Sequence, residues 1–441
     1  MIERRDVLKL LSLATLAVAG GGALSACGSE AVVVEDPTAE QVSYVKSDVP
    51  RAAGDDAAAS RLVDALKSTG GELYEILAAQ TEGNLAISPY SVLVALALTL
   101  NGAVGETRDQ LTALFGDADV ATINGGLNAV TAQIEKQSGP RTKNDGTETE
   151  VVLDAANALF GQQGLTFGQP FLDTLASEYG AGMDTVDYQG DLEAARNAVN
   201  AWTAEQTRDK IPEILPADAV DGGTRLVLVN TLYLKAPWEH PFSGTTSSEP
   251  FTLLDGSSVT VDLMSGSGDV AQAAVVADGW QGVRLAYAGG GLAMTVVLPD
   301  EGRFAEIEAD LVDTGIGTYL DALEPGQATV RLPKWTFRTQ TSLVPALGAL
   351  GVVAAFDPAQ ADFSAMTTEA DLFVTGVLHE VFIAVDEEGT EAAAATAVVM
   401  GETAAAPPEL EFVADRPFLF VIHDVELGTP LFLGRVVDPR S

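Results

Sequence analysis

The residues best able to carry out covalent chemistry are few in this sequence and lie far apart. The 441-residue chain has three histidines, His240, His379 and His423, and one cysteine, Cys27. Their spacing excludes zinc fingers, C-x-x-C redox motifs and disulfide scaffolds, and no G-x-S-x-G, H-E-x-x-H, Walker loop or dinucleotide fingerprint is present. His379 falls within an apolar strand pattern, which is typical of a hydrogen-bonded core histidine. We therefore expect no enzyme activity, no catalytic residue, no metal site and no cofactor.

The most unusual stretch runs over residues 385–400 and precedes the pair Pro407-Pro408. Its four alanines at 392–395 favour a helix, but no amphipathic face would hold that helix in place. With a period of two, one face would carry only small or β-branched residues: Thr390, Ala392, Ala394, Thr396 and Val398. Such a strand could enter a crowded sheet without displacing its neighbours. From these residues alone, an inserting strand and a flexible surface loop are equal alternatives.

The composition restricts the partners of the protein. The chain has 47% hydrophobic residues, enough for a large core, and 63 acidic against 24 basic residues give a net charge of -39. A body this acidic repels phosphate backbones, so we expect no nucleic-acid partner. Lys136, Arg141 and Lys143 are followed closely by acidic residues and form no basic stripe, so we also expect no heparin-type activator. We expect a monomer.

The N-terminus has the pattern of an export and lipidation signal. Arg4-Arg5 and an apolar run precede Leu24-Ser25-Ala26-Cys27, which is similar to a bacterial lipobox. The run is short and glycine-rich for an uncleaved membrane helix. We expect a signal peptide over residues 1–26, lipid on Cys27, a flexible tether to residue 57 and one folded domain over 58–441. Export by the general or the twin-arginine route stays open, and we expect the protein on the outer face of the bacterial cell membrane.

The predicted secondary structure that must position these residues changes along the chain, from mainly helices to mainly strands. Leucine spacing predicts a helix over 58–80, interrupted near Gly70-Gly71, and Ser88-Pro89 predict the cap and first turn of a buried helix. Helical patterns fill most of 104–135 and 169–206. Gly289–Gly291 predicts a hairpin loop. Strand patterns occupy 151–160, 226–234, 258–264, 291–298, 328–335, 372–385, 410–413, 418–425 and 431–437. Early helices and late strands predict an α+β fold with mostly antiparallel sheets.

Segments along nearly the whole of residues 58–441 resemble the serpin family. The stretch at 385–400 is similar to the hinge of the serpin reactive loop, and other family-like motifs occur in the same order. They are Asn84–Ser91, Leu228–Lys235 with Trp238, Leu298–Gly302, Leu332–Trp335, Ala361–Ser364, His379, Arg416–Phe418, Gly434–Val436 and Asp438-Pro439. The resemblance implies a serpin fold with three mostly antiparallel sheets, eight or nine helices and an exposed reactive loop.

The resemblance also implies a mechanism, that of a suicide substrate. A serine protease cuts the loop and forms an acyl-enzyme, and the cleaved loop then inserts into the central sheet and distorts the attached protease. The hinge residues that would insert are Gly389, Thr390, Glu391, Ala392, Ala393, Ala394, Ala395 and Thr396. Because this hinge carries no proline or bulky residue, we expect an inhibitor. The alternative is a non-inhibitory, serpin-like surface lipoprotein that acts as a binding module.

Seven further residues take structural roles by the same resemblance. Ser88, Ser91, Asn230 and His379 match the hydrogen-bonded shutter beneath the central sheet, and Trp238, Lys334 and Glu387 match the breach at the top of the loop strand.

The reactive bond is placed by counting along the loop. Fourteen positions after Gly389 lies Thr403, whereas counting back from Pro407-Pro408 gives Ala404. Both residues are small and uncharged, which suits the primary pocket of elastase-like or subtilisin-like proteases. Glu402 and Met400 are minor alternatives for the bond.

Overall fold

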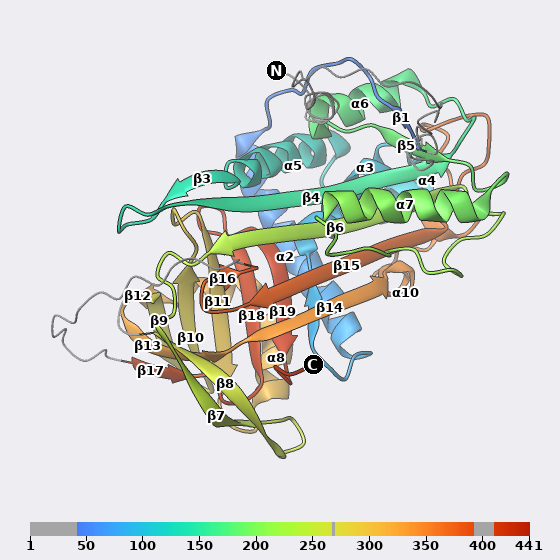
Figure 1. The fold of residues 1–441 in the computed structure, drawn as a ribbon. Helices are drawn as coiled ribbons and strands as arrows, with labels where there is room; N and C mark the ends of the chain where they lie inside the picture. The colour runs from blue at the N-terminus through green and yellow to red at the C-terminus, as the bar shows by residue number, and fades with distance from the viewer. Residues whose placement is uncertain (1–41, 267–269, 392–409) are drawn as a thin grey trace, which may run out of the picture. The chain divides into compact units, whose positions relative to one another are not determined.

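Three sheets and a set of helices form the folded part of the protein (Figure 1). The computed structural model describes residues 42–266, 270–391 and 410–441. Cys27, the expected signal peptide, hinge residues 392–396 and the expected reactive bond at Thr403 and Ala404 lie outside the described residues.

The helices come mainly from the first half of the chain, and the α+β prediction is confirmed. Nine α-helices and one 3₁₀ helix occur within the described residues. They are α2 Asp56–Ala78, α3 Pro89–Leu100, α4 Gly105–Ala113, α5 Val120–Glu135, α6 Gln169–Tyr179, α7 Leu192–Gln206, α8 Phe304–Asp313, α9 Ile316–Asp321, α10 Val344–Ala349 and η2 Ala354–Phe356.

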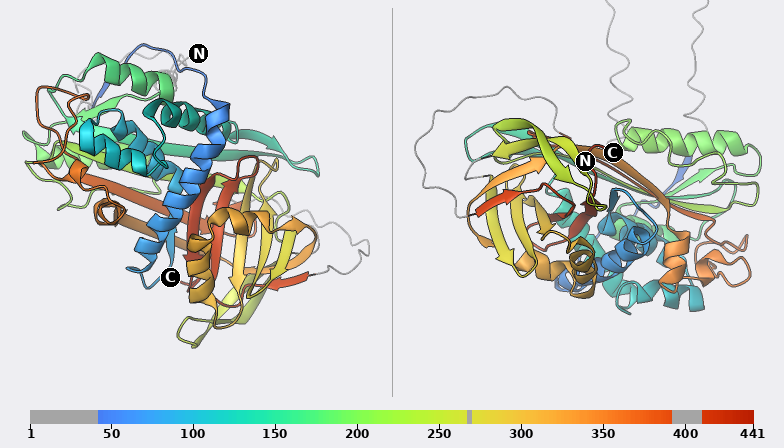
Figure 2. Two further views of the ribbon diagram at one scale, coloured as in Figure 1. Left: turned by 180° about the vertical axis from the view of Figure 1, so that it is seen from behind. Right: turned by 90° about the horizontal axis from the view of Figure 1, so that it is seen from below.

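The main sheet carries the site described below. Its strand order is β1 Ser43–Val45, β5 Met183–Val186, β4 Glu148–Gln162, β6 Leu226–Pro237, β16 Gly389–Thr390, β15 Gly376–Val385 and β14 Trp335–Ser342, with β3 Gly139–Thr142 paired to β4. Helix α7 lies across one face of this sheet, and α2, α3 and α5 lie on the other side (Figures 1 and 2).

Two smaller sheets complete the architecture. One has the order β12 Glu324–Pro325, β9 Ala271–Ala277, β10 Trp280–Ala286, β11 Leu292–Pro299, β18 Phe418–Asp424, β19 Pro430–Val436 and β2 Leu85–Ile87. The other has the order β17 Leu410–Val413, β13 Ala328–Pro333, β8 Ser258–Gly266 and β7 Gly244–Thr252.

Local sequence signals explain several of these elements. The Ser88 hydroxyl accepts a hydrogen bond from the Ser91 amide at 3.2 Å and caps α3, with Pro89 in its first turn as predicted. Helix α2, in contrast, runs through Gly70-Gly71 without the predicted interruption. A Cβ on Gly70 would lie 2.5 Å from the Cβ of Pro89, so this glycine serves the close packing of two helices.

The strand prediction over 328–335 needs correction, whereas most of 169–206 is helical as predicted. Residues 328–335 contain the whole of β13 and the first residue of β14, two strands that belong to different sheets and are separated by Lys334. Residues 169–206 form two helices separated by β5. Both breaks are tertiary effects, since strand pairing with distant segments decides them.

The folded domain begins before the expected residue 58. Strand β1 pairs antiparallel with β5, with Ser43 opposite Thr185. Further on, the Ser47 hydroxyl donates to the Asp173 carboxylate at 2.5 Å and the Ala52 amide to the Ser177 carbonyl at 2.7 Å. Residues 43–55 therefore belong to the folded domain, and their polar, aperiodic sequence did not indicate this.

Candidate functional site: hinge and seam of the main sheet

The main sheet is open at one end between β6 and β15, a boundary that we call the seam. The two strands pair in parallel only over Val227–Leu232 and Gly376–Val381. Beyond this, β16 enters between them, with Thr390 opposite Ala236 on β6 and Val385 on β15. The first hinge residues thus already form the beginning of a strand in the seam.

Gly389 makes this entry possible. The turn that leads to it is closed by Asp386, whose carboxylate accepts hydrogen bonds from the Glu388 and Gly389 amides at 2.9 and 3.2 Å. A Cβ on Gly389 would lie 2.3 Å from the Ala236 carbonyl oxygen. Any side chain here would therefore push the hinge out of the seam.

Thr390 is buried in the entry, with 2% of its surface exposed. Its hydroxyl and the Tyr287 hydroxyl lie 2.6 Å apart, and the Tyr287 ring stacks on Trp238 with 4.5 Å between ring centroids. The side chain faces the sheet formed by β10 and β11, which agrees with the period-two face predicted for this residue. Tyr287 was missed in the sequence, because only the fold brings it to the hinge.

The predicted breach residues meet at the same end of the seam. The Trp238 indole donates to the Asp386 carbonyl at 3.0 Å, and Lys334 Nζ lies 2.8 Å from Glu387 Oε1. Partial burial would raise the pKa of Glu387, but hydrogen bonds from Lys334 and Thr245 outweigh it and hold the pKa below its ordinary value. Their role in loop insertion stays a prediction.

The predicted shutter residues form one buried network where the seam closes. His379 Nδ1 and Asn230 Oδ1 lie 2.5 Å apart, and the Ser88 amide donates to His379 Nε2 at 3.0 Å. Burial lowers the pKa of His379 to about 4, so the imidazole is neutral at physiological pH. Ser91 and Asn230 both bond the Asn157 side chain on β4. Asn157 was missed, although it is one of two polar residues, with Asp154, in the predicted strand 151–160.

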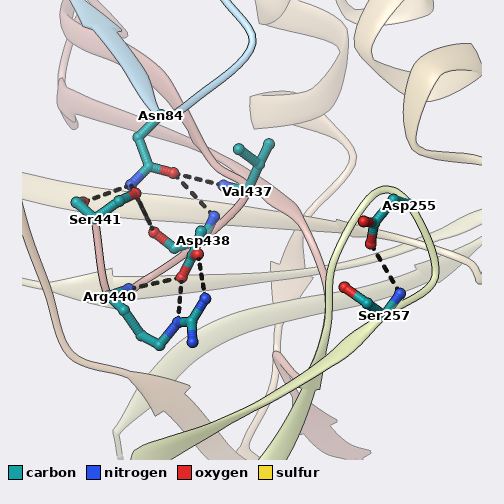
Figure 3. Close-up of polar contacts among 7 residues, drawn as sticks. All are labelled: Asn84, Asp255, Ser257, Val437, Asp438, Arg440 and Ser441. Carbon is teal, nitrogen blue, oxygen red and sulfur yellow. Dashed lines mark hydrogen bonds and ion pairs between the residues drawn. The ribbon is translucent and has the colours of Figure 1, made fainter.

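The signature that precedes α3 also fixes the end of the chain. The Asn84 side chain donates to the Asp438 carbonyl at 2.7 Å and accepts from the Val437 and Asp438 amides (Figure 3). Arg440 turns back onto Asp438, whereas Asp255, seen in the same view, only closes the β7–β8 turn through the Ser257 amide. These contacts are structural, and none of them belongs to the seam.

The remaining candidates show no chemistry of their own. His423 is buried against Thr295, 3.1 Å from its hydroxyl, and Gly289–Gly291 joins β10 to β11 as predicted. The described ranges contain no group of three or more His, Cys, Asp or Glu side chains that could hold a metal ion. In the same part of the chain, no helix is both long and apolar enough to cross a membrane. The feature observed at the seam is the two-residue strand β16, which lies between β6 and β15.

Comparison with known proteins identifies this arrangement. The sequence matches the family "Serpin (serine protease inhibitor)" over residues 64–439. It is 35% identical to the leukocyte elastase inhibitor of Sus scrofa over 365 residues, 81% of this chain and 93% of that protein. It is 32% identical to antithrombin-III of Homo sapiens, over 81% of this chain and 76% of that protein.

Solved structures agree with the sequence comparison. The thermophilic serpin Tengpin in its native state aligns with a TM-score of 0.77 at 25% identity, over 90% of this chain and 100% of that one. The structure of Arabidopsis AtSerpin1 aligns with a TM-score of 0.73 at 27% identity, over 88% and 100%. The chain belongs to the serpin family. Members of this family are not enzymes: most inhibit proteases, and some are non-inhibitory.

Proposed function

We propose that this protein inhibits serine proteases as a suicide substrate, through cleavage of its reactive loop and insertion of the loop into the seam. The observation that carries this proposal is the hinge itself, since Gly389 and Thr390 already pair with β6 and Thr390 also pairs with β15.

The class of protease that this protein would inhibit is inferred from the residues at the expected reactive bond. Thr403 or Ala404 would occupy the primary pocket of the protease, and no Lys or Arg lies between Val385 and Arg416. Small bait residues suit the shallow pocket of elastase-like proteases or the permissive pocket of subtilisin-like proteases. The relatives named as elastase inhibitors support the same direction.

The test is formation of a covalent complex. Incubation with subtilisin or elastase should give an SDS-stable band near the summed masses, because the acyl-enzyme is trapped before deacylation. Protease whose active-site serine has been blocked beforehand by a covalent reagent should give no such band. If active protease nicks the loop and no stable band forms, the non-inhibitory binding lipoprotein becomes the better description.

A second proposal concerns location, namely attachment of the protein to the outer face of the bacterial membrane through lipid on Cys27. Cys27→Ser should abolish lipid modification and release the protein or leave its signal uncleaved, because the thiol is the acceptor of the lipid. Fractionation of cells into membrane and medium, with mass spectrometry of the N-terminus, measures this. A Cys27→Ser protein that stays on the membrane at mature size would show that lipid is not the anchor.

A further inference from the structure

Glu391, the residue after the buried Thr390, is held by a basic side chain from another part of the chain. Its carboxylate Oε1 lies 2.6 Å from Lys210 Nζ, and the Glu391 side chain is 12% exposed. The Glu391 amide donates to the Ala384 carbonyl at 2.8 Å. Burial and the nearby Glu391 carboxylate together raise the pKa of Tyr233 on β6 to about 12. Glu391 therefore lies over the open seam, between Lys210 and β6.

The loop that carries Lys210 is held by contacts with β14 and β15, the strands on the opposite side of the seam from β6. It follows α7, and the Arg338 guanidinium on β14 donates to the Lys210 carbonyl. Arg338 also forms an ion pair with Glu380 on β15 at 3.2 Å, and Lys210 Nζ lies 5.3 Å from the centroid of the Phe382 ring. Lys210 is thus positioned by β14 and β15 and reaches over the seam to the hinge.

Glu391 and the two residues that precede Lys210 have the left-handed backbone conformation. Arg208 and Asp209 have φ angles of 52° and 63°, and Glu391 has a φ of 51°. This conformation is unfavourable for residues other than glycine, so it persists only where surrounding contacts impose it. Glu391 must leave it to become part of a strand.

The strand registers show where the Glu391 side chain would go. Gly389 lies opposite Pro237 and Thr390 opposite Ala236, so continuing this pairing places Glu391 opposite Lys235. Tyr233 and Lys235 alternate with Leu234 and face the same side of β6 as the present position of Glu391. Side chains directly opposite each other on neighbouring strands lie about 5 Å apart, close enough for an ion pair.

We propose that Lys210 is a latch that holds the hinge in its native position, and that Glu391 exchanges Lys210 for Lys235 when the loop inserts. This inference rests on the proposed function, and it assigns positioning roles to Lys210, Lys235 and Glu391. Lys210 restrains the start of insertion, whereas Lys235 stabilises its product. The two lysines therefore have opposite effects on the reaction.

The first experiment needs no protease. Hydrogen–deuterium exchange of the amides of residues 389–391 is measured in the full-length, uncleaved protein. Lys210→Met should speed exchange about fivefold, the effect of losing one partly exposed ion pair. Lys235→Met should leave exchange unchanged, and so should the matched control Lys136→Met on the surface beyond α5.

The second experiment measures insertion, as the number of inhibitor molecules consumed for each subtilisin molecule trapped. Lys235→Met should raise this number, because insertion loses the ion pair that stabilises its product. Lys210→Met should not raise it, because the latch is absent from the inserted form. If Lys210→Met fails to fold, Glu391→Gln removes the same ion pair and should speed exchange equally.

The outcomes separate this inference from the proposed function. Unchanged exchange in both Lys210→Met and Glu391→Gln, or an equal change in Lys136→Met, overturns the latch. Additive effects of Lys210→Met and Glu391→Gln in the double variant also overturn it, since residues that act as a pair must show coupling. A wild-type protein that forms no covalent complex, while Lys210→Met still speeds exchange, rejects inhibition and keeps the latch.

Discussion

A single cut in the reactive loop, between residues 398 and 405, should raise the thermal midpoint of the protein by on the order of tens of degrees. A nick normally lowers or leaves unchanged the stability of a protein. On the proposed mechanism, the nick would free the loop to become a central strand of the main sheet, an arrangement that a kinetic barrier would deny to the native protein. The expected change is therefore large and opposite in sign to the usual effect.

The registers on both sides of the seam make this expectation specific. Continuing the pairs Thr390–Ala236 and Thr390–Val385 would place Ala392 between Leu234 and Ile383. The same count would place Thr396 between Asn230 and His379. Asn230 and His379 are themselves paired in the parallel ladder that now closes the seam. The two independent registers agree, so the inserting strand would part the shutter at Thr396.

Differential scanning calorimetry before and after a clean cut measures the shift. Gly389→Val is the matched control, because a side chain at this position meets the Ala236 carbonyl and blocks the hinge. Cleaved Gly389→Val should melt near the temperature of its uncleaved form. An unchanged melting curve for the cut wild-type protein would mean that the loop does not insert.

Local signals in the sequence predicted those parts of the fold that depend on near neighbours. The Ser88-Pro89 cap, the Gly289–Gly291 hairpin and most strand patterns needed only capping, turn and period-two rules. The continuous path of α2 through Gly70-Gly71 could not be predicted this way, since the reason for Gly70 is Pro89 of the next helix. The early start of the domain at β1 depends likewise on pairing with β5, far along the chain.

The residues of the site likewise fall into those that sequence motifs predicted and those that only the packing of distant elements reveals. Motifs indicated Ser88, Asn230 and His379 as one network, and the structure brings them together. The partners of the hinge come from elements far from it in the chain: Tyr287 meets Thr390, and Lys210 meets Glu391. A period-two pattern predicts that a hinge residue will be buried, but it does not predict which residues will contact it. That information lies in the packing of α7 and two sheets.

Thr390→Arg should change the protein from an inhibitor into a substrate. On the proposed mechanism, inhibition depends on whether loop insertion is faster than deacylation of the bound protease, and Thr390 would be the first residue to insert. Its side chain is buried beside Tyr287, and within the described residues no acidic group is among its hydrogen-bond partners. An arginine there would have to be desolvated without a partner, which costs several kcal/mol, so the hinge would leave the seam.

The two halves of the reaction should respond differently to this change. The expected bond at Thr403 or Ala404 lies thirteen or fourteen positions further along the loop, so protease should cut it at an undiminished rate. Loop insertion would begin late, so the acyl-enzyme would be hydrolysed before the protease is trapped. The covalent band should therefore disappear while the cleaved inhibitor accumulates. Thr390→Ser is the matched control, because it keeps a small side chain and the hydroxyl that meets Tyr287, and it should trap protease as the wild type does. Full trapping by Thr390→Arg would show that insertion does not start at this hinge, since a buried unpaired charge could not be carried into the seam without slowing the strand.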